Sequence, residues 1–343
     1  MKHLLNTLYV TTQGAYLARE GETIVVRIEH ETKLRVPIHT LSGVVCFGQV
    51  SMSPPLMALC AEKAVGVSFL STHGRFLARV EGPVSGNVLL RREQYRRADN
   101  EKHSTAVARS VVAGKIANGR TVLLRALRDH ESMGGREEVE RASTEMGRSI
   151  ARLEPAVSLD VVRGIEGEAA SLYFNVFDNL VVAQKEDFSF RGRSRRPPLD
   201  NLNALLSFVY TLLVHDVESA LEGVGLDPSV GFLHRDRPGR AGLALDLMEE
   251  LRPVLADRLV LSLVNRQQVR AKGFAVSETG AVSMDDDTRK EVLVSWQKRK
   301  QDEIVHPFIE EKIPLGLVPH VQALLLARHL RGDLDAYPPF FWR

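Results

Sequence analysis

The chain has few cysteines and no long apolar run, and each shortage excludes a class of protein. Cys46 and Cys60 are its only cysteines, and they lack CxxC spacing and a neighbouring histidine, so we interpret them as buried small hydrophobes. No run of 18 apolar residues occurs, and the N-terminal residues lack the apolar core and cleavage site of a secretory signal. We therefore expect a cytoplasmic protein without a membrane partner.

Several enzyme signatures are missing as well. The sequence contains no GxxxxGK[ST], no GxSxG and no GxGxxG after a strand-like run, which leaves nucleotide hydrolysis, serine hydrolase chemistry and dinucleotide binding without support. The net charge of +2 is too small to identify a polyanionic partner, so the distribution of charge must decide. The length of 343 residues favours two domains, and the 44% of hydrophobic residues exclude a mainly disordered chain.

Short runs that alternate β-branched and polar residues, such as TIVVRIE and KLRVPI, characterise the first part of the chain. A Ser-Pro-Pro sequence at 53–55 interrupts them, with an N-cap and prolines that suit the first turn of a helix. Turn signals, Gly-Pro at 82–83 and Gly-Asn at 86–87, then end the strand pattern. We predict an N-terminal β-domain over residues 1–86 with one short helix.

Helical periodicity dominates residues 87–343, which we predict to form a larger, mostly α-helical domain. The exception is FAVSETGAVSM, whose two strand-like runs around a Thr-Gly turn predict a β-hairpin before a helix that starts near Asp287. We interpret the acidic run 285–287 as the cap of that helix. The predicted fold class is α+β. The other predicted long helices span Val107–Arg128, Val161–Leu180, Leu202–Glu222, Leu243–Leu263 and Val321–Leu330.

Glu166 stands among apolar neighbours on one of these helices, within RGIEGEAASLYFNVF. Gly164 and Gly167 flank it, and a glycine inside a helix costs about 1 kcal/mol relative to alanine. We therefore expect either a neighbouring helix or a ligand to approach closely there. Glu166 is then either a candidate catalytic carboxylate or a partly buried acid paired with an arginine such as Arg163.

The segment VGFLHRDRPGRAGLALDLMEELRP places His234 before a turn and three acids on the following helix. Asp246, Glu249 and Glu250 stand at i, i+3 and i+4, so like charges crowd one face. A divalent cation relieves that repulsion, and carboxylates with an imidazole suit Mg²⁺ or Mn²⁺ better than they suit thiolate-binding metals. The competing interpretation is a solvated acidic face paired with nearby arginines. These arginines are Arg237, Arg240 and Arg252.

Four arginines in six residues occur in FSFRGRSRRPP, on a loop that closely follows the Glu166 helix. They could neutralise several phosphates, and Phe188 and Phe190 beside them could stack on unpaired bases. A solvated loop is the alternative. The candidate DNA-binding residues are Arg191, Arg193, Arg195, Arg196, Arg237 and Arg240.

With these residues, the chain resembles the CRISPR-associated integrase family of spacer acquisition, and most of all its compact type I-C members. The resemblance spans almost the whole chain and is most specific in four ordered blocks: LLRREQY, RGIEGEAASLYF, DNLNALLSFVYTLL and GFLHRDRPGRAGLALDLMEELRP. It implies an N-terminal β-domain, a helical catalytic domain and a divalent ion, Mg²⁺ or Mn²⁺, held by Glu166, His234 and Glu249. Many relatives have aspartate in the last position, so Asp246, one turn earlier, could share or take that role.

The resemblance also implies an activity and partners. The activity is that of a metal-dependent DNA endonuclease and integrase, in which the 3′-hydroxyl of a captured fragment attacks a target phosphodiester. The partners are double-stranded DNA with 3′ ends, CRISPR repeat DNA, a second copy of the chain joined through the β-domains, and the small CRISPR-associated protein two. The residues alone leave two alternatives open, a non-catalytic DNA-binding scaffold and a junction-resolving repair nuclease.

Overall fold

The computed structural model describes residues 6–72, 74–80, 82 and 87–342. The chain forms two compact units, residues 1–86 with 293–301 and residues 87–292 with 302–343. The first unit is rich in strands and the second is mostly helical, so the predicted α+β class is confirmed. The turn signals at 83 and 86 lie outside the described residues.

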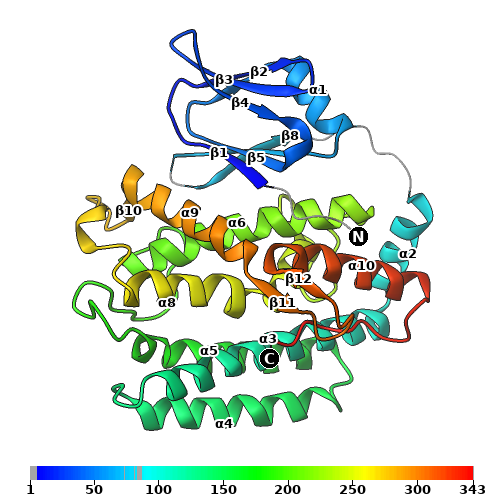
Figure 1. Ribbon diagram of the computed structural model, residues 1–343. Helices are drawn as coiled ribbons and strands as arrows, with labels where there is room; N and C mark the ends of the chain where they lie inside the picture. Colours follow the sequence, from blue (N-terminus) through cyan, green and yellow to red (C-terminus); the bar gives the residue numbers. More distant parts are fainter. Residues whose placement is uncertain (1–5, 73, 81, 83–86, 343) are drawn as a thin grey trace. The chain divides into compact units, whose positions relative to one another are not determined.

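The first unit contains two four-stranded sheets and the short helix α1 (Figure 1). In one sheet β4, β3 and β2 are antiparallel and β6 joins β2 in parallel; in the other β1, β5 and β7 are parallel and β8 is antiparallel to β7. Side chains from both sheets and α1 share one apolar core, which buries Cys46 and Cys60 as free thiols, as predicted. The elements are β1 (Asn6–Val10), β2 (Tyr16–Glu20), β3 (Thr23–Ile28), β4 (Glu31–Pro37), β5 (Leu41–Phe47), β6 (Ser51–Met52), α1 (Pro54–Glu62), β7 (Gly66–Leu70) and β8 (Phe76–Val80).

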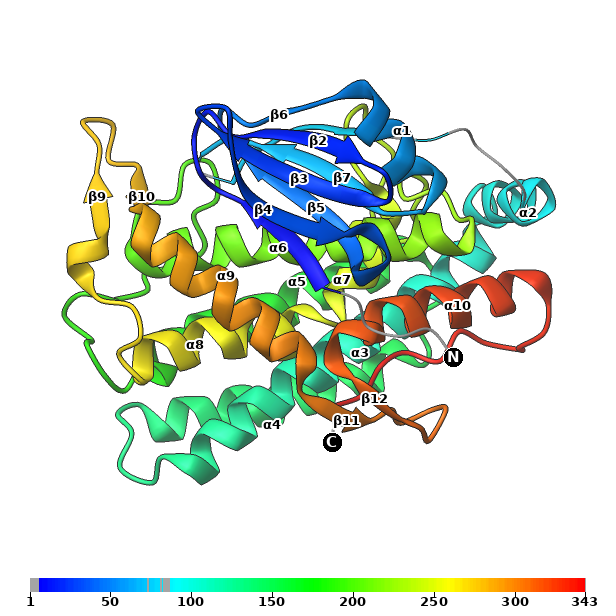
Figure 2. The same cartoon turned by 45° about the horizontal axis from the view of Figure 1, so that its top comes forward.

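In the second unit α3, α4 and α5 pack on one another (Figure 1), and α6 packs against α7 and α10. The hairpin of β9 and β10 extends from the edge of this unit and leads into α9 (Figure 2). The helices of this unit are α2 (Val88–Ala98), α3 (Glu101–Asp129), α4 (Arg136–Leu153), α5 (Leu159–Asn175), α6 (Asn201–Val224), α7 (Gly242–Glu249), α8 (Arg258–Asn265) and α10 (Val318–Arg331). The helix α9 (Asp286–Gln301) begins in this unit, and its residues from Leu293 onward belong to the first. The strands are β9 (Phe274–Val276), β10 (Val282–Met284), β11 (Glu303–Val305) and β12 (Lys312–Pro314).

The predicted hairpin and the acidic cap are confirmed, and the backbone amide of Thr288 donates to Asp285 at 2.8 Å. The single helix predicted over Leu243–Leu263 is wrong, because α7 and α8 are separated by a π-helical segment, Arg252–Asp257. Pro253 lacks the backbone N–H that would continue the α-helical ladder, so the chain widens there. The helix predicted to reach residue 180 ends at Asn175 and continues as a tighter 3₁₀ turn.

Two helices and the β11–β12 hairpin were missing from the sequence prediction. Both α2 and α4 are strongly polar, so their apolar stripes are narrow. The opposite case is α6, which by length and composition is apolar enough to cross a membrane. In the structure 56% of its most apolar window is buried inside the protein, which is also typical of a core helix. Asp200 caps its first turn and Gly225, in the left-handed conformation, ends it.

Candidate active site

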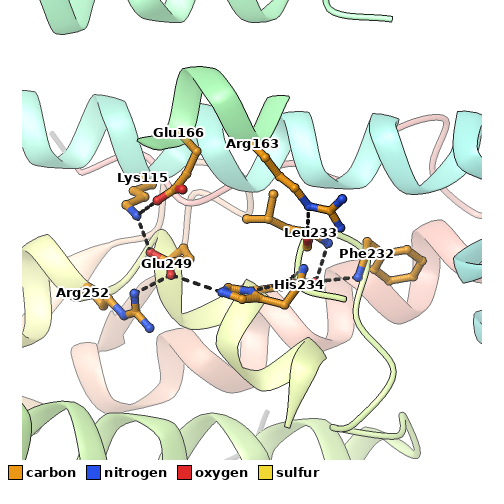
Figure 3. Close-up of polar contacts among 9 residues, drawn as sticks. Lys115, Arg163, Glu166, Phe232, Leu233, His234, Glu249 and Arg252 are labelled. Carbon is orange, nitrogen blue, oxygen red and sulfur yellow. Dashed lines mark hydrogen bonds and ion pairs between the residues drawn. The ribbon is translucent and has the colours of Figure 1, made fainter. Parts of the chain in front are cut away.

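Three helices place one lysine between two carboxylates (Figure 3). Glu166 lies on α5, Glu249 is the last residue of α7 and Lys115 lies on α3. The Lys115 ammonium donates to Glu166, and its Nζ lies 2.8 Å from Oε2 of Glu249. The side chains of Lys115 and Glu249 are only 15% and 4% exposed, so water screens this attraction weakly. One cation therefore joins the two acids that the motifs predicted for the site.

The alternative pairing of Glu166 with Arg163 is wrong. Arg163 instead donates from Nε to the carbonyl of Leu233 at 2.8 Å (Figure 3). From Nη1 it donates to Asp160 at 3.0 Å. Arg163 thus ties α5 to the loop that carries His234.

Gly164 and Gly167 face open space. A Cβ added at either position would meet no atom of the described residues within 4 Å. The expected close approach of a neighbouring helix is therefore not found among the described residues, and the approach of a ligand stays a prediction.

Glu249 is held as an anion although it is buried. Burial opposes its ionisation, but Arg252 and Lys115 outweigh burial and hold its pKa down to about 2. Arg252 donates to Oε1. Oε2 is close to Lys115, yet the direction of approach makes no hydrogen bond, so this buried oxygen has an unused acceptor site.

His234 is oriented by Asp246. The Asp246 carboxylate accepts the backbone amides of Phe232, Leu233 and His234 at 2.5, 2.9 and 2.9 Å, and it lies 2.6 Å from Nδ1 of His234. Because three amides hold this carboxylate as an acceptor, Nδ1 carries the proton and donates it. Nε2 is then left with a lone pair, and it lies 3.9 Å from Oε1 of Glu249.

A glycine is required in the Gly-Phe-Leu-His sequence at 231–234. A Cβ at Gly231 would lie 2.8 Å from Oδ2 of Asp246 and 2.8 Å from the carbonyl carbon of Gly242. Any larger residue would push the loop away from α7 and break the amide contacts that orient His234.

The three acids expected to crowd one face of α7 have three separate environments. Asp246 faces the His234 loop and Glu249 faces Lys115, whereas Glu250 is fully buried among residues near the C-terminus. Glu250 accepts from the Tyr337 hydroxyl, the Phe340 amide and Gln322. Burial outweighs these donors and raises the pKa of Glu250 to about 8. The expected shared face is therefore wrong, and Glu250 anchors the C-terminal segment.

The donor set fits a divalent cation. Among the residues described, no three His, Cys, Asp or Glu side chains stand close enough to form a metal cluster, because Lys115 occupies the space between the carboxylates. Even so, a cation already lies between Glu166 and Glu249, Glu249 retains a free acceptor site, and Nε2 of His234 offers its lone pair. Two carboxylates and an imidazole are ligands suited to Mg²⁺ or Mn²⁺.

Part of the arginine loop reaches the same place. A pocket of about 340 Å³ is lined by Glu166, His234 and Glu249 together with Arg193, Arg195 and Arg240. The other three candidate DNA-binding residues, Arg191, Arg196 and Arg237, are exposed and do not line this pocket.

The expected base-stacking role of the two phenylalanines beside this loop is wrong. Phe188 and Phe190 are buried, and Phe190 stacks on Phe174 with ring centroids 5.9 Å apart. They anchor the loop to the core, because apolar rings are more stable there than in water.

Sequence reasoning missed Lys115, Tyr210 and Asp257, which also line the pocket. Lys115 is a lone charged residue in the small, apolar stretch VVAGKIANG of α3, and that contrast is the one signal of its burial. Tyr210 carried no signal beyond its place in a helix pattern.

The sequence profile of the family described as CRISPR associated protein Cas1 matches residues 8–298. The chain belongs to the Cas1 family. A CRISPR-associated endonuclease Cas1 of Chlorobaculum tepidum is 57% identical over 343 residues, which cover all of both chains. This chain is therefore a CRISPR-associated endonuclease and integrase of spacer acquisition, as the sequence motifs predicted.

Two solved structures share the Cas1 fold with the chain. A casposase bound to its integration product has a TM-score of 0.85 at 20% identity, covering 99% of this chain and 95% of that one. A Cas6-RT-Cas1–Cas2 complex contains a chain with a TM-score of 0.82 at 22% identity, covering 98% of this chain and 36% of that one.

Proposed function

We propose that this Cas1 protein is a metal-dependent enzyme whose Mg²⁺ or Mn²⁺ is held by Glu166, His234 and Glu249. The observation that supports the proposal is the convergence of two carboxylates, the partly buried Glu166 and the buried Glu249, on one ammonium, beside an imidazole whose Nδ1 is fixed by Asp246. Asp246 is fully engaged by His234 and three backbone amides, so we assign it to positioning His234 and Glu249 to the third ligand position. The Lys115 ammonium leaves its place between the acids when the ion binds.

The proposed reaction is transfer of a phosphodiester. The 3′-hydroxyl oxygen of a captured fragment forms a bond to a target phosphorus as the bond from that phosphorus to the target strand's own oxygen breaks, and the leaving oxygen takes up a proton. With water as the nucleophile, the same site hydrolyses DNA. A divalent ion supplies charge stabilisation on the phosphate oxygens. Asp246 keeps the His234 ring in place, and Lys115, once displaced, could contact a phosphate oxygen in the same pocket.

The substrates proposed are double-stranded DNA with 3′ ends and CRISPR repeat DNA. Support comes from the arginines around the pocket and from the open strip at Gly164 and Gly167, where a backbone can approach closely. The casposase in the related fold was solved with its integration product, which is consistent with this assignment.

The assembly proposed is a homodimer joined through residues 1–86, bridged by the small protein Cas2, in the cytoplasm. The first unit exposes large apolar side chains on strands at the outer edges of its sheets, among them Leu34 on β4 and Leu77 on β8. The related fold in the Cas6-RT-Cas1–Cas2 complex supports the Cas2 partner. The four sequence blocks support a type I-C assignment, with residues 87–343 as the catalytic domain.

Substitution of the proposed ligands tests the function. We expect Glu166→Gln and His234→Ala to abolish joining of a prespacer DNA to a repeat-containing plasmid in Mn²⁺ while the proteins stay folded. Glu168→Gln is the matched control, because Glu168 lies on the same helix but is half exposed and pairs with Arg152. We expect it to join DNA like the wild type.

Three results would contradict the proposal. Joining at the wild-type rate by folded Glu166→Gln would remove that residue from the site, and salt-sensitive binding without any metal-dependent cutting or joining would indicate a scaffold. A clear preference for branched DNA over the repeat plasmid would indicate a junction-resolving nuclease.

A further inference from the structure

The pocket that contains the proposed metal ligands has a second end, which the reaction described above does not use. Two guanidinium groups lie against the ring of Tyr210, with Cζ of Arg193 5.1 Å and Cζ of Arg252 5.2 Å from its centroid. The Tyr210 hydroxyl donates to Asp257 at 2.6 Å, and Tyr173 donates to the other oxygen of Asp257 at 3.0 Å. All five side chains line the pocket.

The π-helical segment explains how the two arginines reach one ring. Arg252 and Asp257 stand five residues apart, and five residues is the hydrogen-bond spacing of a π-helix, so both lie on the same side of the segment. Arg193 comes from the loop before α6, where the carbonyl oxygen of the Asn203 side chain accepts from it. Tyr210 lies about two helical turns after Asn203 on α6. It is thus contacted from two separate parts of the chain.

The charges at this end are not balanced. Arg252 is neutralised by Glu249, whereas no carboxylate of the described residues forms an ion pair with Arg193, and its acceptor Asn203 is neutral. Arg195 and Arg240 line the same pocket, likewise without an ion pair to a described carboxylate. Burial lowers the pKa of Arg193, and Arg195 adds to this effect despite the opposing influence of Tyr210. Cation–π contact and the nearby Asp257 carboxylate offset part of the cost, and the positive charge that the other arginines leave in the pocket favours an anion.

Both stacked guanidiniums also have unused donors. The Nε–H groups of Arg193 and Arg252 are buried and make no hydrogen bond to any described residue. Buried donors without an acceptor are rare in folded proteins, because each costs about 1–3 kcal/mol. A phosphate offers several acceptor oxygens and a negative charge at once.

We propose that Arg193 and Arg252, held against Tyr210, form a phosphate-binding subsite next to the metal end of the pocket. Arg252 belongs to both ends, since it pairs with Glu249 and stacks on Tyr210. The subsite therefore takes a DNA phosphate that neighbours the reacting one, and it places the strand without touching the reacting atoms. Tyr210 and Asp257 are positioning residues that keep the two guanidiniums apart and aligned. This assignment rests on the proposed function.

The test is DNA binding without metal, which separates this subsite from the ion. A fluorescent duplex with single-stranded 3′ ends is titrated with protein in EDTA at several salt concentrations. We expect Arg193→Gln to weaken binding about tenfold and to lower the slope of log K against log salt by about 0.9, the value for one lost phosphate contact. Arg193→Lys keeps the charge, so we expect the wild-type slope with a smaller loss of affinity.

Two tyrosine variants separate positioning from folding. Tyr210→Phe keeps the ring under both guanidiniums, so we expect affinity within twofold of the wild type, whereas Tyr210→Leu removes the ring and should weaken binding as Arg193→Gln does. Arg141→Gln is the matched control, because Arg141 is exposed on α4 and forms an ion pair with Glu138 at the surface.

The proposal is overturned if Arg193→Gln has the wild-type affinity and salt slope. It is also overturned if Arg193→Lys and Tyr210→Phe lose binding as fully as Arg193→Gln and unfold at equally reduced urea concentrations, because the arginine then serves only the fold. Failure of the proposed function looks different. The metal end is tested by strand transfer in Mn²⁺, which the wild type should perform and Glu166→Gln should lose. Both of these proteins keep Arg193, so that comparison does not test the subsite.

Discussion

Replacement of Asp246 by asparagine tests whether this residue orients His234 or binds the ion itself. The carboxylate is 1% exposed and accepts four hydrogen bonds, at Oδ2 from the amides of Phe232 and Leu233 and at Oδ1 from the amide and Nδ1 of His234. An asparagine keeps one oxygen, so in either orientation its NH₂ group faces two donors.

The expected magnitude follows from those two orphaned donors. At about 1–3 kcal/mol each, they would lower the free energy of unfolding by about 2–6 kcal/mol. When the NH₂ group faces His234, the ring relieves one clash by moving its proton from Nδ1 to Nε2, so one orphaned donor remains and we expect a loss of about 1–3 kcal/mol. The same shift removes the Nε2 lone pair, and loss of such an orienting partner typically lowers metal affinity or activity by about 10- to 100-fold.

Three measurements check this prediction for Asp246→Asn. Urea unfolding gives the loss of stability, ¹⁵N nuclear magnetic resonance of the metal-free protein gives the His234 tautomer, and joining of a prespacer to a repeat plasmid in Mn²⁺ gives the activity. Wild-type stability together with a proton still on Nδ1 would refute the positioning role. If Mn²⁺ binding were also lost in that case, Asp246 would be a direct ligand.

Three other changes test separate parts of the site. Gly231→Ala should lower the free energy of unfolding by about 1–3 kcal/mol, measured in urea, because its Cβ would lie 2.8 Å from Asp246. Lys115→Met should melt at a lower temperature than the wild type without metal. Its melting temperature should rise more on addition of Mn²⁺ than that of the wild type, because the ion restores the missing charge. Glu250→Gln should remove a pH dependence. The folded-state pKa of Glu250, about 8, exceeds the ordinary 4.5, so protonation of Glu250 stabilises the folded protein. This stabilisation is fully present below pH 4.5 and is lost as pH rises through 8, to the extent of about 5 kcal/mol.

Each of these predictions has a result that contradicts it. Unchanged unfolding of Gly231→Ala would mean that the loop has room for a side chain. An equal Mn²⁺ effect on Lys115→Met and wild type in thermal melts would mean that the ion does not replace the ammonium. Parallel pH profiles of wild type and Glu250→Gln between pH 5 and 8 would mean that Glu250 is not protonated in the folded protein.

How far the sequence could predict the site depends on distance along the chain. Glu166, His234 and Glu249 lie in motifs whose local pattern was visible, and the Asp285 cap was visible for the same reason. Lys115 precedes Glu166 by 51 residues, and a lysine within a helix is usually solvated, so nothing local indicated its pairing.

The helix after His234 shows a second limit. Asp246 and Glu249 lie on the expected helix, but α7 ends at Glu249, so Glu250 follows it and a π-helical segment, Arg252–Asp257, replaces the expected continuation. Residues at i, i+3 and i+4 share a face only in a continuous α-helix. The spacing therefore predicted one crowded face where the structure has three environments.

By itself the sequence determined the β-rich first unit, the helical second unit, the β9–β10 hairpin and the family, and it predicted the acids and histidine of the proposed site, because period and motif are local properties. Only the tertiary structure decided which partner each charged group has. Four contacts join residues from different elements. They are Lys115 with two acids, Asp246 with His234, Glu250 with the C-terminal residues, and two arginines with Tyr210. In a buried site, charge must be compensated by whatever the fold brings near, and no local pattern contains that information.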